Sequence, residues 1–256
     1  MFGTNQLSGF GGGSAGVDRG EPPNGDLEYW FRADLGVTTA TGVSAWQSQN
    51  PAGGSAGTDS LEQATSGKQP AYDATGTVGT LAGAGFITGD GTDDVLRHAD
   101  FDVGAQPIHI FLVFNPVSWT SDEHILTGIT TPLLIRQSWH SYSPSYDGGA
   151  VAEKVELVSG DYPRGGQEFA NGEWHLAGAF FNGTASTLQR DDQTAVAADS
   201  LNTSGIIDGL SLFSNPPDTS GYGNVSIAEI LIYSAAQAGG DLTAVKNYIN
   251  DQYGLF

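Results

Sequence analysis

The 256-residue sequence contains no cysteine, so disulfide bridges and thiolate metal sites are excluded. Basic residues are scarce as well: Lys and Arg together number 9 against 29 Asp and Glu, which gives a formal net charge of −20 at pH 7. Such a charge repels the phosphates of nucleic acid at long range. We therefore expect no nucleic-acid partner.

Long apolar runs are also missing. No segment has the length and hydrophobicity of a transmembrane span, and residues 1–10 have neither the basic region nor the apolar core of a signal peptide. These absences predict a protein without a membrane partner, one that reaches its destination without crossing a membrane.

Helical periodicity is confined to one segment, residues 241–253. Its apolar residues recur at helical spacing and form one stripe, namely Leu242, Val245, Ile249 and Tyr253. We expect Asp241 to be the N-cap and Gly254 to stop the helix in the αL conformation. Because a helix of three turns is marginal in water, it should lie on a sheet that contains the preceding strand, residues 224–234.

Glycine and strand-like segments are abundant. Gly numbers 37, and β-rich runs separated by turn residues follow one another along the chain. Residues 107–114 are apolar on both faces, as in a central sandwich strand. Asn182-Gly183 joins two further runs as a hairpin. This pattern predicts an antiparallel β-sandwich.

Two parts of the chain resemble a known family. Near the end, Ile227-Ala-Glu-Ile-Leu-Ile-Tyr233 is followed by a short loop and the amphipathic helix. In the N-terminal half, Phe86 is followed, with two extra residues, by Asp90-Gly-Thr-Asp-Asp-Val-Leu96. Both features are similar to concanavalin A-like (laminin G-like) jelly-roll domains. The resemblance implies an all-β, antiparallel jelly-roll sandwich with one short C-terminal helix over residues 26–256.

Residues 1–25 differ from the rest of the chain. Gly11-Gly-Gly-Ser-Ala-Gly16 is typical of a linker, and Phe2, Leu7 and Phe10 precede it as spaced apolar residues. We expect an extended, Gly-rich N-terminal arm that attaches the domain to a neighbouring chain. Phe2, Leu7 and Phe10 would bind that partner.

Asp90, Asp93 and Asp94 form a candidate Ca²⁺ site, since carboxylate oxygens are the ligands that this ion prefers. The alternative, which we favour, is a turn whose carboxylates accept hydrogen bonds from backbone N–H groups. No other cofactor is expected. Glu229 lies inside an apolar run, where it either points outward at the sheet edge or accepts buried hydrogen bonds, and we expect its role to be structural.

Signals of catalysis are weak. Two G-x-S-x-G matches, at residues 12–16 and 53–57, lack the strand and helix that a nucleophile elbow requires. Glycoside hydrolysis requires two carboxylates across a cleft, whereas Glu153 and Glu156 fall on opposite faces of one strand, as at a solvated edge. The histidines show no ligand spacing, and we expect His109 and His175 to face solvent or a polar partner. We therefore predict that the chain is not an enzyme.

The most distinctive loop contains Trp139, Tyr142 and Tyr146. Aromatic faces stack on sugar rings, which makes these residues candidates for glycan binding. The same residue types also fill cores and protein interfaces.

These observations predict a non-enzymatic virion structural protein of a tailed phage, either a capsid decoration protein or a tail accessory protein. It would assemble in the host cytoplasm, reside in the virion, and contact other virion proteins and further copies of itself. The alternative is a carbohydrate-binding adhesin or tail-fibre receptor-binding module that contacts a host glycan. A third hypothesis is a glycoside hydrolase or lyase.

Overall fold

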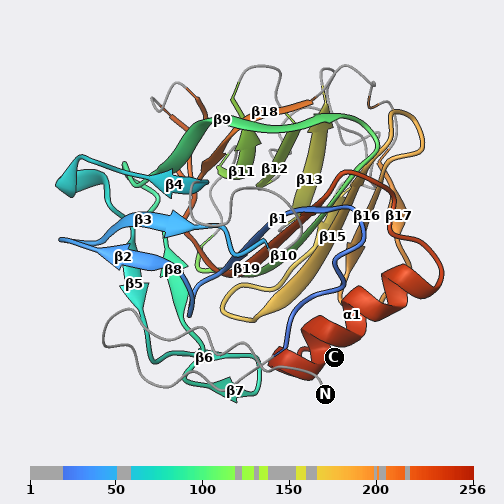
Figure 1. Ribbon diagram of the computed structural model, residues 1–256, viewed down its shortest axis with the longest axis horizontal. Helices are drawn as coiled ribbons and strands as arrows, with labels where there is room; N and C mark the ends of the chain where they lie inside the picture. The colour runs from blue at the N-terminus through green and yellow to red at the C-terminus, as the bar shows by residue number, and fades with distance from the viewer. Residues whose placement is uncertain are drawn as a thin grey trace, which may run out of the picture.

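The computed structural model describes most of the chain after the first nineteen residues. The described ranges are 20–50, 59–118, 123–129, 133–137, 154–159, 166–198, 201, 206–216 and 220–256. Within them the strands build two large antiparallel sheets, called here sheet A and sheet B, and a two-stranded hairpin of β6 (Thr77–Val78) and β7 (Leu81–Ala82) (Figure 1).

Sheet A has eight strands, and its last strand in sequence lies near its centre. In order the strands are β17 (Val196–Ala197), β16 (Thr187–Arg190), β15 (His175–Phe181), β10 (Ile108–Pro116), β19 (Val225–Tyr233), β8 (Phe86–Thr88) and β5 (Ala71–Asp73). The eighth strand, β1 (Leu27–Arg32), pairs with β19 from Tyr233 to Glu229, on the side where β8 pairs with Ser226 and Ile227.

Sheet B has nine strands. In order they are β14 (Gly166–Glu168), β13 (Lys154–Ser159), β12 (Leu133–Gln137), β11 (His124–Gly128), β18 (Ile206–Leu212), β9 (Leu96–Ala105), β4 (Ser60–Glu62), β3 (Val43–Gln47) and β2 (Val37–Thr39). A short 3₁₀ helix, η1 (Ser66–Lys68), follows β4.

The main core lies between the two sheets. Strand residues point alternately to the two faces of a sheet, and the inward ones form one buried cluster drawn from both sheets. On β1, Phe31 faces this core and packs near Trp46 of sheet B, with 5.4 Å between ring centroids. Trp30 faces the opposite way. The two aromatics therefore lie on opposite faces of sheet A.

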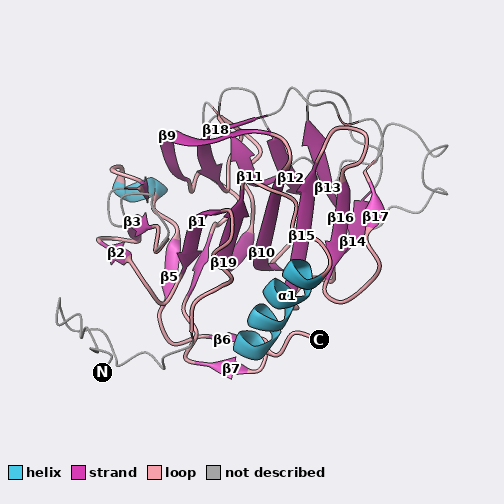
Figure 2. Cartoon of the chain, turned by 45° about the vertical axis from the view of Figure 1, so that its right-hand side comes forward, coloured by secondary structure: helices cyan, strands magenta, loops and turns pink. Residues whose placement is uncertain are grey.

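The outer face of sheet A, the one turned away from sheet B, is covered by the helix α1 (Gly240–Tyr253) (Figure 2). Val245, Tyr248, Ile249 and Tyr253 are buried against outward residues of sheet A and against Val78 of the β6–β7 hairpin. Leu242, also predicted for this stripe, is partly buried on the same cluster.

The predicted fold class, an all-β jelly-roll sandwich with one C-terminal helix, is confirmed by the two stacked antiparallel sheets. Gly254 ends α1 in the αL conformation as predicted, at φ 60° and ψ 51°. The predicted N-cap is wrong: Gly239 occupies that position, and Asp241 lies in the first turn. No helix in the described part of the chain combines the length and apolarity needed to span a membrane.

Candidate functional site

The outer face of sheet A holds a buried polar cluster centred on Glu229. This carboxylate is fully buried. Its Oε1 accepts hydrogen bonds from Trp30 Nε1 at 2.7 Å and Tyr248 Oη at 2.8 Å, and its Oε2 accepts one from Tyr253 Oη at 2.8 Å. Burial raises the pKa of the Glu229 carboxyl, while these hydrogen bonds and the nearby charge of Arg32 oppose that rise. The cluster joins β1, β19 and α1, so the predicted structural role is supported.

The outer face of sheet B carries polar residues instead. Ile135, Val155 and Leu212 point into the core, so their neighbours Arg136, Glu156 and Ser211 point outward. Sheet B thus has charged and polar residues on its outer face, whereas α1 packs on the outer face of sheet A.

Three neighbouring strands bring a histidine, an arginine and a glutamate into one row of this face. His124 on β11 lies opposite Arg136 on β12, which lies opposite Glu156 on β13. Arg136 Nε is 2.6 Å from Glu156 Oε1. Glu156 is 7% exposed, so its predicted place at a solvated edge is wrong: the arginine partner makes its burial tolerable.

Hydroxyl groups continue the polar face next to this row. Thr127 pairs with Ser211, and both are fully buried. His124 Nδ1 lies 3.0 Å from Thr127 Oγ1, and Ser211 Oγ lies 3.0 Å from Ser214 Oγ. The imidazole and the hydroxyls are buried and bonded among themselves, so they form a fixed polar layer beside the Arg136–Glu156 pair.

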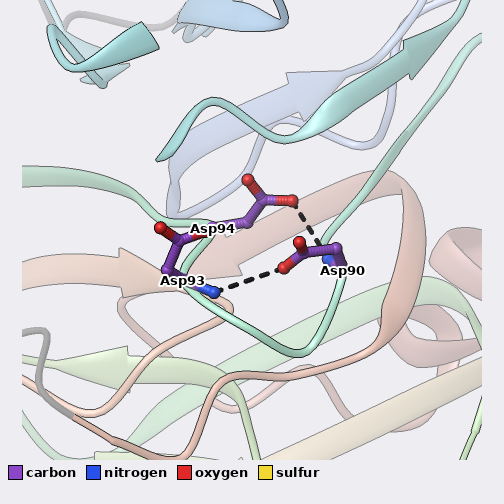
Figure 3. Close-up of side chains that lie close together, drawn as sticks. All are labelled: Asp90, Asp93 and Asp94. Atoms are coloured by element: carbon purple, nitrogen blue, oxygen red, sulfur yellow. Dashed lines mark hydrogen bonds between the residues drawn. The ribbon is translucent and has the colours of Figure 1, made fainter. Parts of the chain in front are cut away.

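Asp90, Asp93 and Asp94 come together in the loop after β8, where each offers a carboxylate oxygen within 4.8 Å of the others (Figure 3). Asp90 Oδ1 accepts hydrogen bonds from the backbone N–H groups of Thr92 and Asp93, and Asp94 Oδ2 accepts one from Asp90 N. The favoured prediction of a carboxylate-capped turn is therefore confirmed. The same three oxygens are also placed so that they could hold a metal ion.

Burial raises the pKa of Asp94 to about 6, with further contributions from the charges of Asp90 and Asp93. A bound cation would favour the ionised form and reverse this effect.

The two strand histidines are buried. His109 Nδ1 accepts a hydrogen bond from Gln237 N at 3.3 Å, and burial lowers the pKa of His109 to about 3, so the ring is neutral at pH 7. His175 Nδ1 lies 3.1 Å from Asp191 Oδ2. Both therefore have the predicted polar partner. Among the described residues, Asp90, Asp93 and Asp94 are the one metal-ligand group, and it contains no histidine.

Several predicted sites lie outside the described residues. They are the arm residues Phe2, Leu7 and Phe10, the aromatic residues Trp139, Tyr142 and Tyr146, Glu153, and both G-x-S-x-G matches. The domain boundary at residue 26 also stays a prediction. Residues just before it contact the sandwich, since Tyr233 Oη donates to the carbonyl oxygen of Pro23 at 2.8 Å.

The site on sheet B was missed because its residues come from distant segments. The usable signal is alternation: in Leu133–Gln137 and Lys154–Ser159, a charged residue follows a buried apolar one. Alternation shows that a side chain faces outward. It does not show which strands are neighbours.

No family model and no curated protein sequence matches the chain. Solved structures do resemble it. Domain 4 of AbnA, a GH43 extracellular arabinanase from Geobacillus stearothermophilus, solved in complex with arabinotriose, is 16% identical with a TM-score of 0.54, over 87% of this chain and 98% of that one.

Two larger enzymes resemble the chain over part of their length. A GH54 α-L-arabinofuranosidase variant soaked with 4-nitrophenyl α-L-arabinofuranoside is 12% identical with a TM-score of 0.59, over 82% of this chain and 51% of the enzyme. Trypanosoma rangeli sialidase in complex with sialic acid is 8% identical with a TM-score of 0.54, over 89% of this chain and 33% of the enzyme. The chain thus spans about half and a third of these enzymes, and the likeness establishes the fold.

These comparisons contradict the predicted phage virion role and the prediction that the chain is not an enzyme. The similar structures come from glycoside hydrolases, and several hold a carbohydrate or an inhibitor. The predicted virion role depended on a resemblance to a family. That resemblance indicates the sandwich architecture, and proteins with this architecture have very different functions.

Proposed function

We propose that this chain is a carbohydrate-active β-sandwich of the glycoside-hydrolase kind, which binds an oligosaccharide on the outer face of sheet B. The observation that carries the proposal is the likeness to an isolated arabinanase domain over 98% of that domain's length, in a structure that holds arabinotriose. The larger neighbours act on carbohydrates too.

The outer face of sheet B is the better binding surface for a physical reason. Sugars expose hydroxyl groups, each of which is both a donor and an acceptor, so their recognition requires polar groups in fixed positions. Arg136 and Glu156 are fixed by their 2.6 Å ion pair on neighbouring strands. The outer face of sheet A carries an apolar cluster instead, and α1 packs on that cluster.

Titration calorimetry with arabinotriose and a panel of neutral oligosaccharides tests the proposal. Arg136→Lys keeps the positive charge but removes the planar fork that makes two parallel hydrogen bonds. We expect it to weaken binding about tenfold, the value of one such contact. Lys246→Ala, on α1 at the opposite side of the sandwich, is the control and should bind like the wild type. If Arg136→Lys bound the oligosaccharide with the same affinity as the wild type, this face would not be the binding site.

A second function, hydrolysis of a glycosidic bond, is favoured by the enzymes among the neighbours and by the buried carboxylate of Glu156 on the same face. The reaction uses a pair of carboxyl groups, one of which protonates the leaving group. Turnover of 4-nitrophenyl glycosides tests it. Loss of turnover in Glu156→Gln, with folding retained, supports catalysis by this residue, whereas unchanged turnover contradicts it.

Trp139, Tyr142 and Tyr146 extend the proposal. They belong to the segment that joins β12 to β13, the strands that carry Arg136 and Glu156. Stacking on sugar rings is the role that we propose for them. Trp139→Ala and Tyr142→Ala should each weaken oligosaccharide binding in the same calorimetric assay, and unchanged affinity in both would contradict this role.

For the loop of Asp90, Asp93 and Asp94 we propose Ca²⁺ as the ion, because three carboxylates form a hard, oxygen-only ligand set. Added Ca²⁺ should raise the thermal unfolding midpoint of the wild type. Asp94→Asn should remove that rise, whereas Asp100→Asn, a nearby exposed carboxylate, should keep it. An equal rise in both variants would contradict binding at this loop.

A further inference from the structure

The cations of sheet B share one arrangement. Its described strands contain three lysine or arginine residues, and each lies directly opposite a glutamate on the neighbouring strand. The pairs are Lys154 with Glu168, Arg136 with Glu156, and Arg97 with Glu62.

All three pairs lie on the outer face. Val155, Leu96 and Leu61 point into the core, so the adjacent Lys154, Arg97 and Glu62 point outward. Residues directly opposite in an antiparallel pair have Cβ atoms about 5 Å apart, within reach of an ion pair for long side chains. For the central pair the contact is direct, at 2.6 Å between Arg136 Nε and Glu156 Oε1.

We propose that the oligosaccharide recognised by this face is neutral and that saccharides with carboxylate or sulfate groups are rejected. The inference rests on the proposed function and adds the class of its ligand. It also distinguishes between the ligands of the similar structures: sialic acid carries a carboxylate and would be rejected, whereas arabinotriose carries no charge and would be accepted.

The physical reason is that each described lysine or arginine of the face lies opposite a glutamate, and Arg136 is held by its glutamate in a direct ion pair. Recognition of a carboxylate requires a guanidinium or ammonium group that can turn its donors toward the ligand. Here an anionic sugar would have to compete with Glu62, Glu156 or Glu168. The described strands of sheet B also contain Asp100, Asp102 and Asp208, so acidic residues outnumber basic ones on this sheet. The net charge of −20 adds long-range repulsion.

A neutral diol fits the same pairs. One hydroxyl can donate to the glutamate while its neighbour accepts from the arginine or lysine. Such contacts leave the ion pair in place, so neither charge is left without a partner.

The test measures binding of the full chain to neutral oligosaccharides, with arabinotriose as the first probe, and to anionic ones, with sialyllactose and oligogalacturonate as probes, at low and high NaCl. We expect the wild type to bind a neutral probe with an affinity that salt does not change, and to bind the anionic probes at least about tenfold more weakly at low salt, where unscreened repulsion is largest.

Two double variants isolate the cause. Glu62→Gln with Glu168→Gln removes the negative charges opposite Arg97 and Lys154, and we expect about tenfold tighter binding of the anionic probes at low salt, which high salt removes. Glu173→Gln with Asp251→Asn makes the same change in net charge at exposed positions outside sheet B and serves as the control.

The outcomes separate the two proposals. If the wild type binds an anionic probe more tightly than every neutral one, the ligand class is wrong and the carbohydrate function stands. If the two double variants gain equally, net charge and not the pairs determines selectivity, which also overturns the inference. If no saccharide of either kind binds, the proposed function fails, and the inference fails with it.

Discussion

Glu229 is the residue on which the joint between sheet A and α1 depends. Its carboxylate accepts three hydrogen bonds from side chains far apart in the sequence, among them Trp30, which is 199 residues away. A buried acceptor group that loses its partners keeps the cost of desolvation without compensation. The stability of the whole outer layer of sheet A is therefore sensitive to this one side chain.

Replacing Glu229 by glutamine tests that dependence. The amide keeps the volume but turns one acceptor oxygen into a donor that faces donors. We expect Glu229→Gln to lower the free energy of unfolding by about 1–3 kcal/mol in urea titrations. Glu173→Gln, at an exposed position, should change it by less than about 0.5 kcal/mol. Equal stability of the two variants would show that Glu229 does not hold the helix.

The raised pKa of Asp94 predicts a pH dependence with a definite sign. Because this pKa is about 6 in the folded protein, against an ordinary value of 3.8, the folded state holds the proton more tightly than the unfolded chain. The corresponding stability is fully present below about pH 4 and is lost as pH rises through 6. Without Ca²⁺, the stability of Asp94→Asn relative to the wild type should therefore increase between pH 4 and pH 7. A constant difference over this range in denaturant titrations would contradict the prediction.

At the residue scale, the sequence predicts the chemical role of a side chain better than it predicts which residues that side chain contacts. It indicates a structural role for Glu229, inside an apolar run, and it favours a turn in which the carboxylates of the Asp90 loop bind backbone N–H groups. The actual partners of Glu229 depend on how α1 lies across sheet A, which local pattern does not determine. His124, Arg136 and Glu156 lie in one row because β11, β12 and β13 are neighbouring strands, and local pattern does not determine strand order either.

At the scale of elements, the β6–β7 hairpin holds the end of α1. Thr80 N donates to Tyr253 O at 2.7 Å, and a Cβ on Gly79 would lie 2.1 Å from that same oxygen. Gly79 also has φ +57°, in the left-handed region. The hairpin and the helix end can approach this closely because position 79 has no side chain.

Gly79→Ala and Gly83→Ala form a matched pair for testing this contact. Both glycines have positive φ, but a Cβ at Gly83 meets nothing within 4 Å. Gly83→Ala should cost about 1 kcal/mol through backbone strain alone. Gly79→Ala should lower the free energy of unfolding by clearly more than Gly83→Ala does, because the end of the helix must also shift. Similar unfolding free energies for the two variants would argue against a tight hairpin–helix contact.

The elements themselves were largely predictable. The 3.6-residue period gives α1, and apolar runs with turns between them give the long strands. The N-cap was not predictable. Asp241 is a good capping residue by type, yet the cap lies two residues earlier, at Gly239, whose φ of 55° suits glycine. Strand order in sheet B was also beyond local pattern, since β11 lies between β12 and β18.

For the molecule as a whole, the charge of −20 predicts a response to salt. Like-charge repulsion destabilises the compact state at pH 7, and added ions screen it. NaCl should therefore raise the thermal unfolding midpoint at pH 7 and have little effect near the isoelectric point of about 4.1. An equal salt effect at both pH values, measured by circular dichroism, would contradict a charge-based cause.

Function is the level at which sequence reasoning went wrong. Composition and periodicity led correctly to a two-layer sandwich, but a sandwich serves enzymes, binding modules and structural proteins alike. The polar face of sheet B, which separates these classes here, exists only once nine short segments are placed side by side.

The position of β19 has a consequence for how the protein is made. This strand is the last of the sandwich to leave the ribosome, yet β10 flanks it on one side and β1 and β8 on the other. A nascent chain that still lacks it has a gap in the middle of one layer and cannot close its core. The sandwich should therefore fold cooperatively, and only after β19 has been synthesised. A product truncated before Val225 should be degraded by proteases and should not accumulate as a stable, partly folded domain.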